Sequence, residues 1–373
     1  MNLLLARRRL CALCLAAVWA TPLGAQKWQV QYFYDKGKSS FTIGDLQFAS
    51  ATRGVAVGVI ADGKRQEPTA VVTSDGGAHW QTVLLKEAPL SLFFLNESMG
   101  WMVTAKGLWR TADVGKTWTK LPKLPAEIYR VCFLDEKRGF AVGPKKVALE
   151  TPDGGMTWKP LGVGGADARE DIRYSAYTWI AFGTPRFGLI TGWNIPPRRF
   201  APEFPDWVDP EGTLQQREQP HLSYTLGTAD GGAHWTLGAG SLFGSVSRVR
   251  LSANGTGLGL VQYGESFRYP SEVYSITWPV GKNTSVYRDA KFDISDIWLA
   301  SDGTAYLAGV QVRGQMRTLI PGKVQVLSST DLKNWTAIPV DYRAEANSTI
   351  LAASGDDNLW LATNTGMILK LVR

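Results

Sequence analysis

The chain has 373 residues and a formal net charge of +7, from 40 Lys and Arg against 33 Asp and Glu. This mild basic excess argues against a nucleic-acid-binding protein, in which basic residues dominate a domain. Three histidines, three cysteines and the lack of an acidic cluster with calcium-loop spacing argue against a metal site. We therefore expect no metal.

Residues 1–25 have the features of a secretory signal peptide. Arg7-Arg8-Arg9 forms the charged start, Leu10–Ala20 the apolar stretch and Leu23-Gly24-Ala25 a cleavage site. The apolar stretch is too short to span a bilayer, and no later segment is long and apolar enough. Cleavage near Ala25 removes three arginines and leaves a net charge of +4. We expect an exported protein, periplasmic or secreted, with no transmembrane segment; the sequence leaves Sec and twin-arginine export open.

A strand pair recurs through the rest of the chain. Each copy has an apolar residue, a small or glycine residue six positions later in the clear copies, and four further strand residues. The seven copies begin at Phe48, Phe94, Phe133, Phe182, Leu251, Leu299 and Ala353. They are 46, 39, 49, 69, 48 and 54 residues apart, close to the roughly 40–50 residues of a β-propeller blade. The sequence predicts one all-β domain over residues 26–373, a seven-bladed propeller of four-stranded antiparallel blades.

The last unit predicts how the ring closes. After its strand pair the chain contains one more strand, Met367–Val372, so this blade lacks a fourth strand. A spare strand, Trp28–Phe33, lies near the start of the mature chain. Pairing the two strands would remove the open edges that unpaired strands present.

An octapeptide of the form Thr-x-Asp-x-Gly-x-x-Trp follows the third strand of four units, at 73–80, 111–118, 151–158 and 228–235, with a shortened copy at 329–335. The Asp can accept hydrogen bonds from backbone N–H groups within a turn, and the Gly can adopt a positive φ. The Trp can bury its ring while its indole N–H donates to a partner. We expect structural roles for the Asp and Trp residues of the four octapeptides: Asp75, Trp80, Asp113, Trp118, Asp153, Trp158, Asp230 and Trp235.

These octapeptides resemble the Asp-box, or bacterial neuraminidase repeat, of sialidases and sortilin-type receptors. Together with strands such as Gly54–Gly58 and Gly139–Gly143, they most resemble the photosystem II stability/assembly factor family and its non-photosynthetic bacterial relatives. The resemblance covers about residues 45–335. It implies a cofactor-free, seven-bladed propeller that binds other proteins and uses the Asp residues as turn staples.

One face of the predicted propeller carries unusual loops. Unit four has a long insertion, residues 193–223, with six prolines and several aromatic residues. Loops of this length in a compact domain are usually functional or disordered. Candidate partner-binding residues on this face are Arg198, Arg199, Trp207, Arg268 and Arg313.

A second set of candidates lines the central opening. Three residues before each aligned apolar position the units carry Asp45, Ser91, Arg130, Trp179, Arg248, Asp296 and Ile350. In one interpretation the charges Asp45, Asp296, Arg130 and Arg248 neutralise one another. In the other they form an arginine-rich patch able to hold an anionic ligand or partner.

The sequence favours a monomeric, non-enzymatic scaffold that binds another exported or membrane protein through this basic, aromatic face. A sialidase-like glycoside hydrolase acting on an anionic glycan is the alternative, because arginines from separate blades could hold a carboxylate. Sialidases, however, are six-bladed, and neither their early Arg-Ile-Pro signature nor a Tyr–Glu nucleophile pair can be assigned here. A structural module with inert faces is the third hypothesis.

Overall fold

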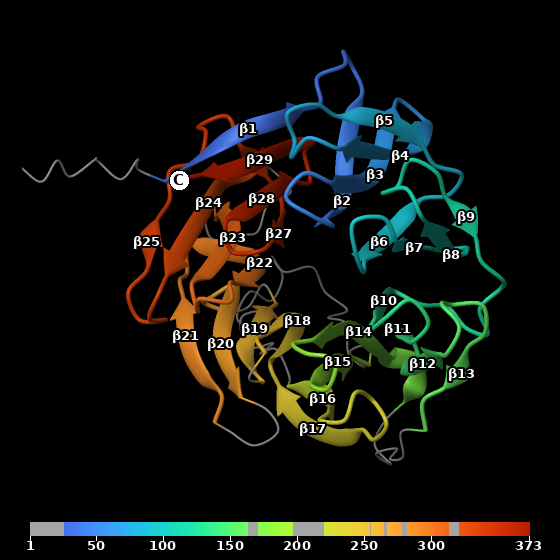
Figure 1. The fold of residues 1–373 in the computed structure, drawn as a ribbon. Helices are drawn as coiled ribbons and strands as arrows, with labels where there is room; N and C mark the ends of the chain where they lie inside the picture. The colour runs from blue at the N-terminus through green and yellow to red at the C-terminus, as the bar shows by residue number, and fades with distance from the viewer. Residues whose placement is uncertain are drawn as a thin grey trace, which may run out of the picture.

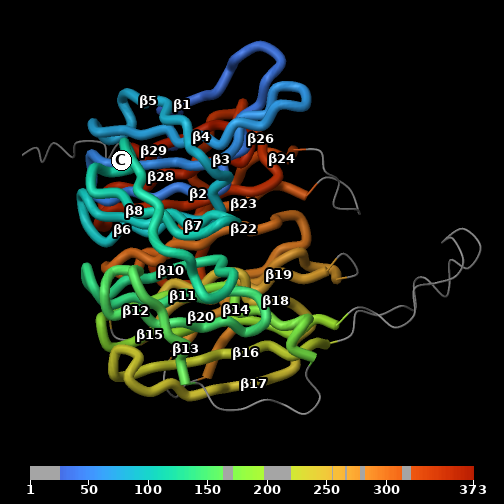
Figure 2. Tube along the Cα trace, turned by 90° about the vertical axis from the view of Figure 1, so that its right-hand side faces the viewer, coloured from blue at the N-terminus to red at the C-terminus, as the bar shows by residue number. Residues whose placement is uncertain are grey.

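The computed structural model describes residues 26–162, 171–196, 220–253, 255–264, 267–277, 282–312 and 321–373. These residues form seven antiparallel sheets arranged as a ring around a central axis (Figures 1 and 2). The predicted seven-bladed propeller is therefore confirmed. The predicted signal peptide, residues 1–25, lies outside the described residues.

Each blade is a consecutive set of strands. Blade one contains β2 (Ser40–Phe48), β3 (Gly54–Asp62), β4 (Arg65–Thr73) and β5 (Gln81–Leu84). Blade two contains β6 (Pro89–Phe94), β7 (Gly100–Thr104), β8 (Gly107–Thr111) and β9 (Thr119–Lys120). Blade three contains β10 (Arg130–Phe133), β11 (Gly139–Gly143), β12 (Val147–Thr151) and β13 (Lys159–Pro160). Blade four contains β14 (Ser175–Phe182), β15 (Gly188–Asn194), β16 (His221–Thr228) and β17 (Thr236–Leu242). Blade five contains β18 (Gly244–Leu251), β19 (Thr256–Tyr263), β20 (Ser271–Thr277) and β21 (Thr284–Arg288). Blade six contains β22 (Phe292–Leu299), β23 (Ala305–Gln311), β24 (Gly322–Ser329) and β25 (Thr336–Ala337). A short strand, β26 (Glu345–Ala346), also pairs with β24, and one 3-10 turn, η1 (Ile172–Tyr174), precedes β14.

Blade seven closes the ring as the sequence predicts. It contains β27 (Thr349–Ser354), β28 (Asn358–Thr363) and β29 (Met367–Val372), and its fourth strand is β1 (Lys27–Phe33). β1 and β29 pair antiparallel, with Trp28 opposite Leu371 and Phe33 opposite Met367. Figure 1 shows β1 beside β29 at the edge of this blade.

The six-residue spacing from apolar residue to glycine has a steric cause. In blade three the Phe133 ring lies directly on the backbone of Gly139, where an added Cβ would overlap the ring. The same contact recurs between Phe48 and Gly54, Phe94 and Gly100, and Phe182 and Gly188. Any side chain at these glycines would displace the ring, so the pattern records a packing requirement.

Neighbouring blades are joined by aromatic residues. Trp101 of β7 stacks on Phe133 of blade three at a centroid distance of 3.6 Å and donates its indole N–H to the Gly154 carbonyl. Trp360 of β28 repeats this contact at the closing junction. It stacks on Phe48 of blade one at 3.5 Å and donates to the Gly76 carbonyl.

The octapeptides form the turns between the third and fourth strands. In the first, Asp75 Oδ1 accepts hydrogen bonds from the Thr73 hydroxyl and the His79 N–H, both at 2.9 Å. The Trp80 indole donates to the Gly77 carbonyl at 3.0 Å, and Gly77 has a φ of 101°. The same bonds recur around Asp113, Asp153 and Asp230, with Trp118, Trp158 and Trp235 as the indole donors.

These bonds predict an acid-sensitive contribution to stability. Hydrogen bonds from the backbone and side chain of His79 lower the pKa of Asp75 to about 2. Because the folded-state pKa is depressed, the stabilisation is complete above about pH 4, the unfolded value, and is lost as the pH falls toward 2. We expect the stability of Asp75→Asn to fall less steeply than that of wild type between pH 4 and 2, as measured by urea unfolding. Asp62→Asn, at an exposed strand end, is the control, and parallel curves for wild type and Asp75→Asn would contradict the prediction.

The insertion in blade four is shorter than the sequence predicts. β15 and β16 stay paired to its ends, with Trp193 opposite Ser223 and Asn194 opposite Leu222. The first two and the last three residues of the predicted loop are therefore strand, because the β15–β16 pairing continues through them. Residues 197–219 lie outside the described part of the chain.

Candidate functional site

The inner strand of each blade positions the residues that line the central opening (Figure 1). In five of these strands the pairing register shifts by one residue, as it does between Ile43 and Asp45 in β2 and between Ile294 and Asp296 in β22. The residue that follows the shift is the aligned candidate itself, namely Asp45, Ser91, Trp179, Arg248 and Asp296. β-Bulges re-aim side chains, and the repeated bulge gives these positions a common setting.

The two carboxylates are buried and hold adjacent blades together. Asp45 is 4% exposed, and its oxygens accept the N–H of Leu46 at 2.9 Å and that of Leu92, in blade two, at 2.8 Å. Asp296 does the same for Ile297 and for Leu351 in blade seven, both at 2.9 Å. The carboxylates thus satisfy backbone donors that would otherwise be buried without partners.

Three arginines surround Trp179 in the central opening. The guanidinium carbons of Arg130, Arg248 and Arg250 lie 3.9, 4.6 and 5.6 Å from the centre of the Trp179 ring. Trp179 is 5% exposed, and its indole N–H donates to the Val249 carbonyl at 3.0 Å. The electron-rich ring face attracts cations, so one buried tryptophan gathers arginines from blades three and five.

Charge pairing in this cluster is loose. Arg130 lies 3.9 Å from Asp45, and Arg248 and Arg250 each lie 3.6 Å from Asp296. These distances exceed the 2.7–2.9 Å of a charge-assisted hydrogen bond. Arg248 and Arg250 each donate to one backbone carbonyl, and within the described residues Arg130 donates no hydrogen bond. Among the described residues, most guanidinium N–H groups of the cluster therefore have no hydrogen-bond acceptor.

Burial in the central opening affects the pKa of two of the arginines. Desolvation in the opening, opposed by the charge of Asp45, lowers the pKa of Arg130 to about 10. Desolvation also lowers the pKa of Arg250, with Asp296 opposing it. With three arginines and two aspartates, the cluster has a formal charge of +1.

The structure brings only some of the predicted residues together. Asp45, Arg130, Arg248 and Asp296 meet at the central opening through the contacts above. Arg268 lies apart from them, exposed on the blade-five loop, where its guanidinium packs over Tyr269 at 5.4 Å. Arg198, Arg199, Trp207 and Arg313 lie outside the described residues.

The sequence analysis missed Arg250. It lies two residues after Arg248 in β18, and alternate residues of a strand share a face. That spacing could have revealed it. Arg250 also donates to the Ile297 carbonyl at 3.1 Å and packs 4.9 Å from the Trp298 ring, so it bridges blades five and six.

Comparison with known proteins places this architecture. No protein-family model matches the chain. Over 115 residues, 28% of this chain and 34% of the relative, it is 31% identical to the photosystem II assembly lipoprotein Ycf48 of Synechococcus sp. (strain CC9902). The alignment thus spans about a third of the length of that relative.

Solved structures extend the likeness in fold. YCF48 from Cyanidioschyzon merolae superposes with a TM-score of 0.58 at 17% identity, over 92% of this chain and 98% of that one. YCF48 bound to D1 peptide gives 0.57 at 16% identity, over 91% and 99%. The chain is a propeller that resembles the photosystem II assembly factors. The resemblance expected from the octapeptides is confirmed, in sequence over the aligned segment and in fold over nearly the whole chain.

The likeness to Ycf48 does not decide the chemistry by itself. A streptogramin B lyase structure gives a TM-score of 0.56 at 11% identity, over 92% of this chain and 97% of that one. The same ring therefore also occurs in a lyase, and function must be argued from the site.

A Tyr–Glu pair does occur, in blade five. The buried carboxylate of Glu272 accepts the Tyr263 hydroxyl at 2.6 Å and the Tyr274 hydroxyl at 2.8 Å, and lies 3.6 Å from Arg288. Burial and the hydrogen bond to Glu272 raise the pKa of Tyr263. Among the described residues, no hydrogen bond or ion pair joins this pair to the arginines of the central opening, which would have to hold the anionic sugar. The pair therefore gives no support to sialidase-like chemistry.

Proposed function

We propose that this chain is an exported, non-enzymatic scaffold that binds an anionic segment of another protein through the arginines of its central opening. The observation that carries the proposal is the cluster of Arg130, Arg248 and Arg250 around Trp179. In the described part of the chain most of their guanidinium N–H groups have no acceptor. Arginine holds carboxylates with paired, directed hydrogen bonds. The two carboxylates of the cluster leave this capacity free because they bind backbone N–H groups.

The comparisons support protein binding as the kind of activity. Ycf48 is described as an assembly lipoprotein, and one of the similar structures holds a D1 peptide. For the present chain we propose a partner in the same compartment, either an exported or a membrane protein. We further propose that the octapeptide aspartates serve their turns and take no part in binding, because their oxygens already accept hydrogen bonds within the turn.

Pull-down from membrane and periplasmic extracts tests the proposal. We expect Arg130→Gln/Arg248→Gln to lose a partner that the wild type captures, with affinity reduced at least about tenfold, because hydrogen bonds to charged groups contribute about 1.5–3 kcal/mol each. The control is Arg53→Gln/Arg186→Gln, which removes the same charge from exposed turns on the octapeptide face. Equal capture by all three proteins would refute the location of the site.

The enzyme alternative has its own test. We expect the wild type to hydrolyse no compound in a panel of fluorogenic glycosides that includes anionic sugars. Hydrolysis that Arg130→Gln/Arg248→Gln abolishes would replace the scaffold proposal with an enzymatic one.

A further inference from the structure

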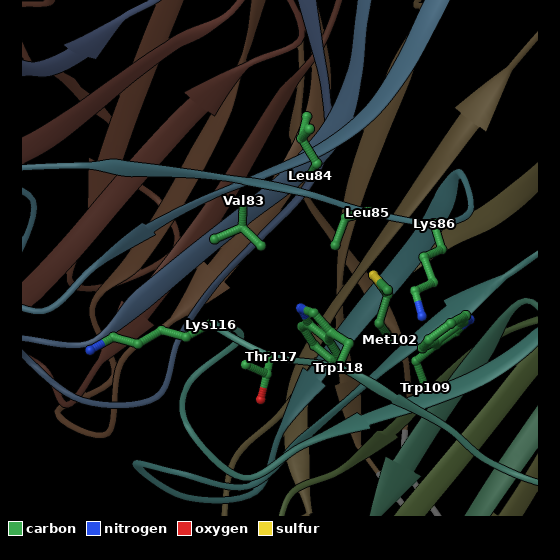
Figure 3. Close-up of a pocket in the computed structure, with 9 residues that line it drawn as sticks. All are labelled: Val83, Leu84, Leu85, Lys86, Met102, Trp109, Lys116, Thr117 and Trp118. Carbon is green, nitrogen blue, oxygen red and sulfur yellow. The ribbon is translucent and has the colours of Figure 1, made fainter.

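A small pocket opens at the rim of the ring between blades one and two, outside the central opening (Figure 3). It has a volume of about 160 Å³ and is lined by Val83, Leu84, Leu85, Lys86, Met102, Trp109, Lys116, Thr117 and Trp118. Met102 and Trp109 are buried, whereas the side chain of Leu84 is 70% exposed. An apolar cavity of about 150 Å³ suffices to bind benzene in another protein. The pocket thus has room for one aromatic ring.

The residues around the pocket differ from those at the next two junctions. The third residue after the octapeptide Trp is a leucine in blades two and three, Leu121 and Leu161, but a valine, Val83, in blade one. Leu121 is buried in the next junction, where it packs in the core with Leu149. Here the smaller Val83 lies with the broad indole of Trp109 instead, and the space between them stays open.

The aromatic wall of the pocket is held in place. Trp109 donates its indole N–H to Glu87 Oε2 at 3.0 Å, and the same oxygen accepts the Thr104 hydroxyl at 2.6 Å. Lys120 forms an ion pair with the other oxygen of Glu87 and packs 5.5 Å from the Trp109 ring. A ring fixed in this way loses little freedom when a ligand packs against it.

The charges at the pocket mouth favour a carboxylate. The ammonium group of Lys86 lies 5.8 Å from the Trp109 ring centre. Figure 3 shows Lys86 beside Trp109, whereas the side chain of Lys116 extends away from Trp118 and Met102, so Lys86 is the cation at the mouth. Glu87 is engaged by Lys120, and neither Lys86 nor Lys116 has an acidic partner among the described residues. A ligand with an acidic group beside its apolar part would therefore complement the site.

We propose that this rim pocket binds an aromatic side chain of an extended partner segment that carries a carboxylate next to it. The neighbouring strand β5 pairs with β4 on one side only in the described structure, so its free edge can hydrogen-bond the backbone of such a segment. The pocket shares no residue with the arginine cluster, and the inference is independent of the function proposed for that cluster.

Three acetylated, amidated tripeptides test the proposal: Glu-Phe-Glu, Lys-Phe-Lys and Glu-Ala-Glu. Binding is followed by NMR of the mature protein labelled at its methionine methyl groups, with Met102 as the pocket reporter and Met367 as the reference. We expect Glu-Phe-Glu to shift the Met102 signal with a Kd on the order of 1 mM, given the ligand's size. No shift with Glu-Phe-Glu, or equal shifts with either other peptide, overturns the proposal.

Substitutions locate the site. Val83→Phe should fill the pocket and abolish the shift, whereas Leu161→Phe, the matched change at another junction, should leave it. Lys86→Glu should weaken binding about threefold, as expected for an exposed charge contact. Lys123→Glu, an exposed lysine of blade two, should have no effect. Unchanged binding in Val83→Phe would overturn the assignment to this pocket.

Discussion

Replacing Trp360 with alanine is expected to lower the free energy of unfolding by about 4 kcal/mol, the usual cost of truncating a buried aromatic side chain. Trp360 is fully buried. Its ring stacks on Phe48 at 3.5 Å, and its N–H donates to the Gly76 carbonyl at 3.2 Å. The substitution removes a contact between the last blade and the first, at the one junction where the ring must be closed by distant parts of the chain.

Urea unfolding of the mature protein measures this loss. Trp360→Phe is the informative companion variant, because it keeps a ring against Phe48 but leaves the Gly76 carbonyl without its donor. We expect it to cost about 1–2 kcal/mol. A loss below about 1 kcal/mol for Trp360→Ala would show that the junction does not depend on the stack.

Removing the carboxylate of Asp45 is expected to lower the free energy of unfolding by about 3–5 kcal/mol, the usual cost of removing one partner of a buried ion pair. Asp45→Ala leaves the buried N–H groups of Leu46 and Leu92 without an acceptor and takes from Arg130 its nearest carboxylate, 3.9 Å away. The Leu92 bond crosses from blade one to blade two, so its loss weakens a junction as well as a strand.

The same unfolding measurement applies, with two companion variants. Asp45→Asn keeps one acceptor oxygen and should recover part of the lost stability. Asp62→Ala, at an exposed strand end of the same blade, should change stability by no more than about 0.5 kcal/mol. If Asp45→Ala proved as mild as Asp62→Ala, the carboxylate would have no part in holding the blades together.

The fold was predictable because its rules are local. The six-residue interval from Phe133 to Gly139 reflects a ring on a bare backbone, and the octapeptide bonds join residues within one turn. Ring closure was predictable because the last unit lacks a fourth strand and a spare strand lies near the start of the mature chain. These features depend on short stretches of sequence, which repeat and can be compared with one another.

The candidate site was predictable only in part, because it depends on contacts between blades. The shared repeat position indicated Arg130 and Arg248, but not that Trp179 would gather them together with Arg250. Nor could the sequence indicate that Asp45 and Asp296 would bind backbone N–H groups of the following blade. The bulges that position these residues shift the register by one residue and leave no signature in the strand pattern.

The pairing of β1 with β29 makes folding of this molecule depend on its two ends in a way that the other six blades avoid. Those blades each form from a continuous stretch of chain, whereas the last blade is completed only when Lys27–Phe33 pairs with Met367–Val372. Contacts between segments so distant in sequence have high contact order and form slowly. Until they form, β29 lacks its outer neighbour, and both β29 and β1 have an unpaired edge that can pair with another chain. The strand pairing that closes the finished ring is thus also a folding step at which pairing with another chain can compete.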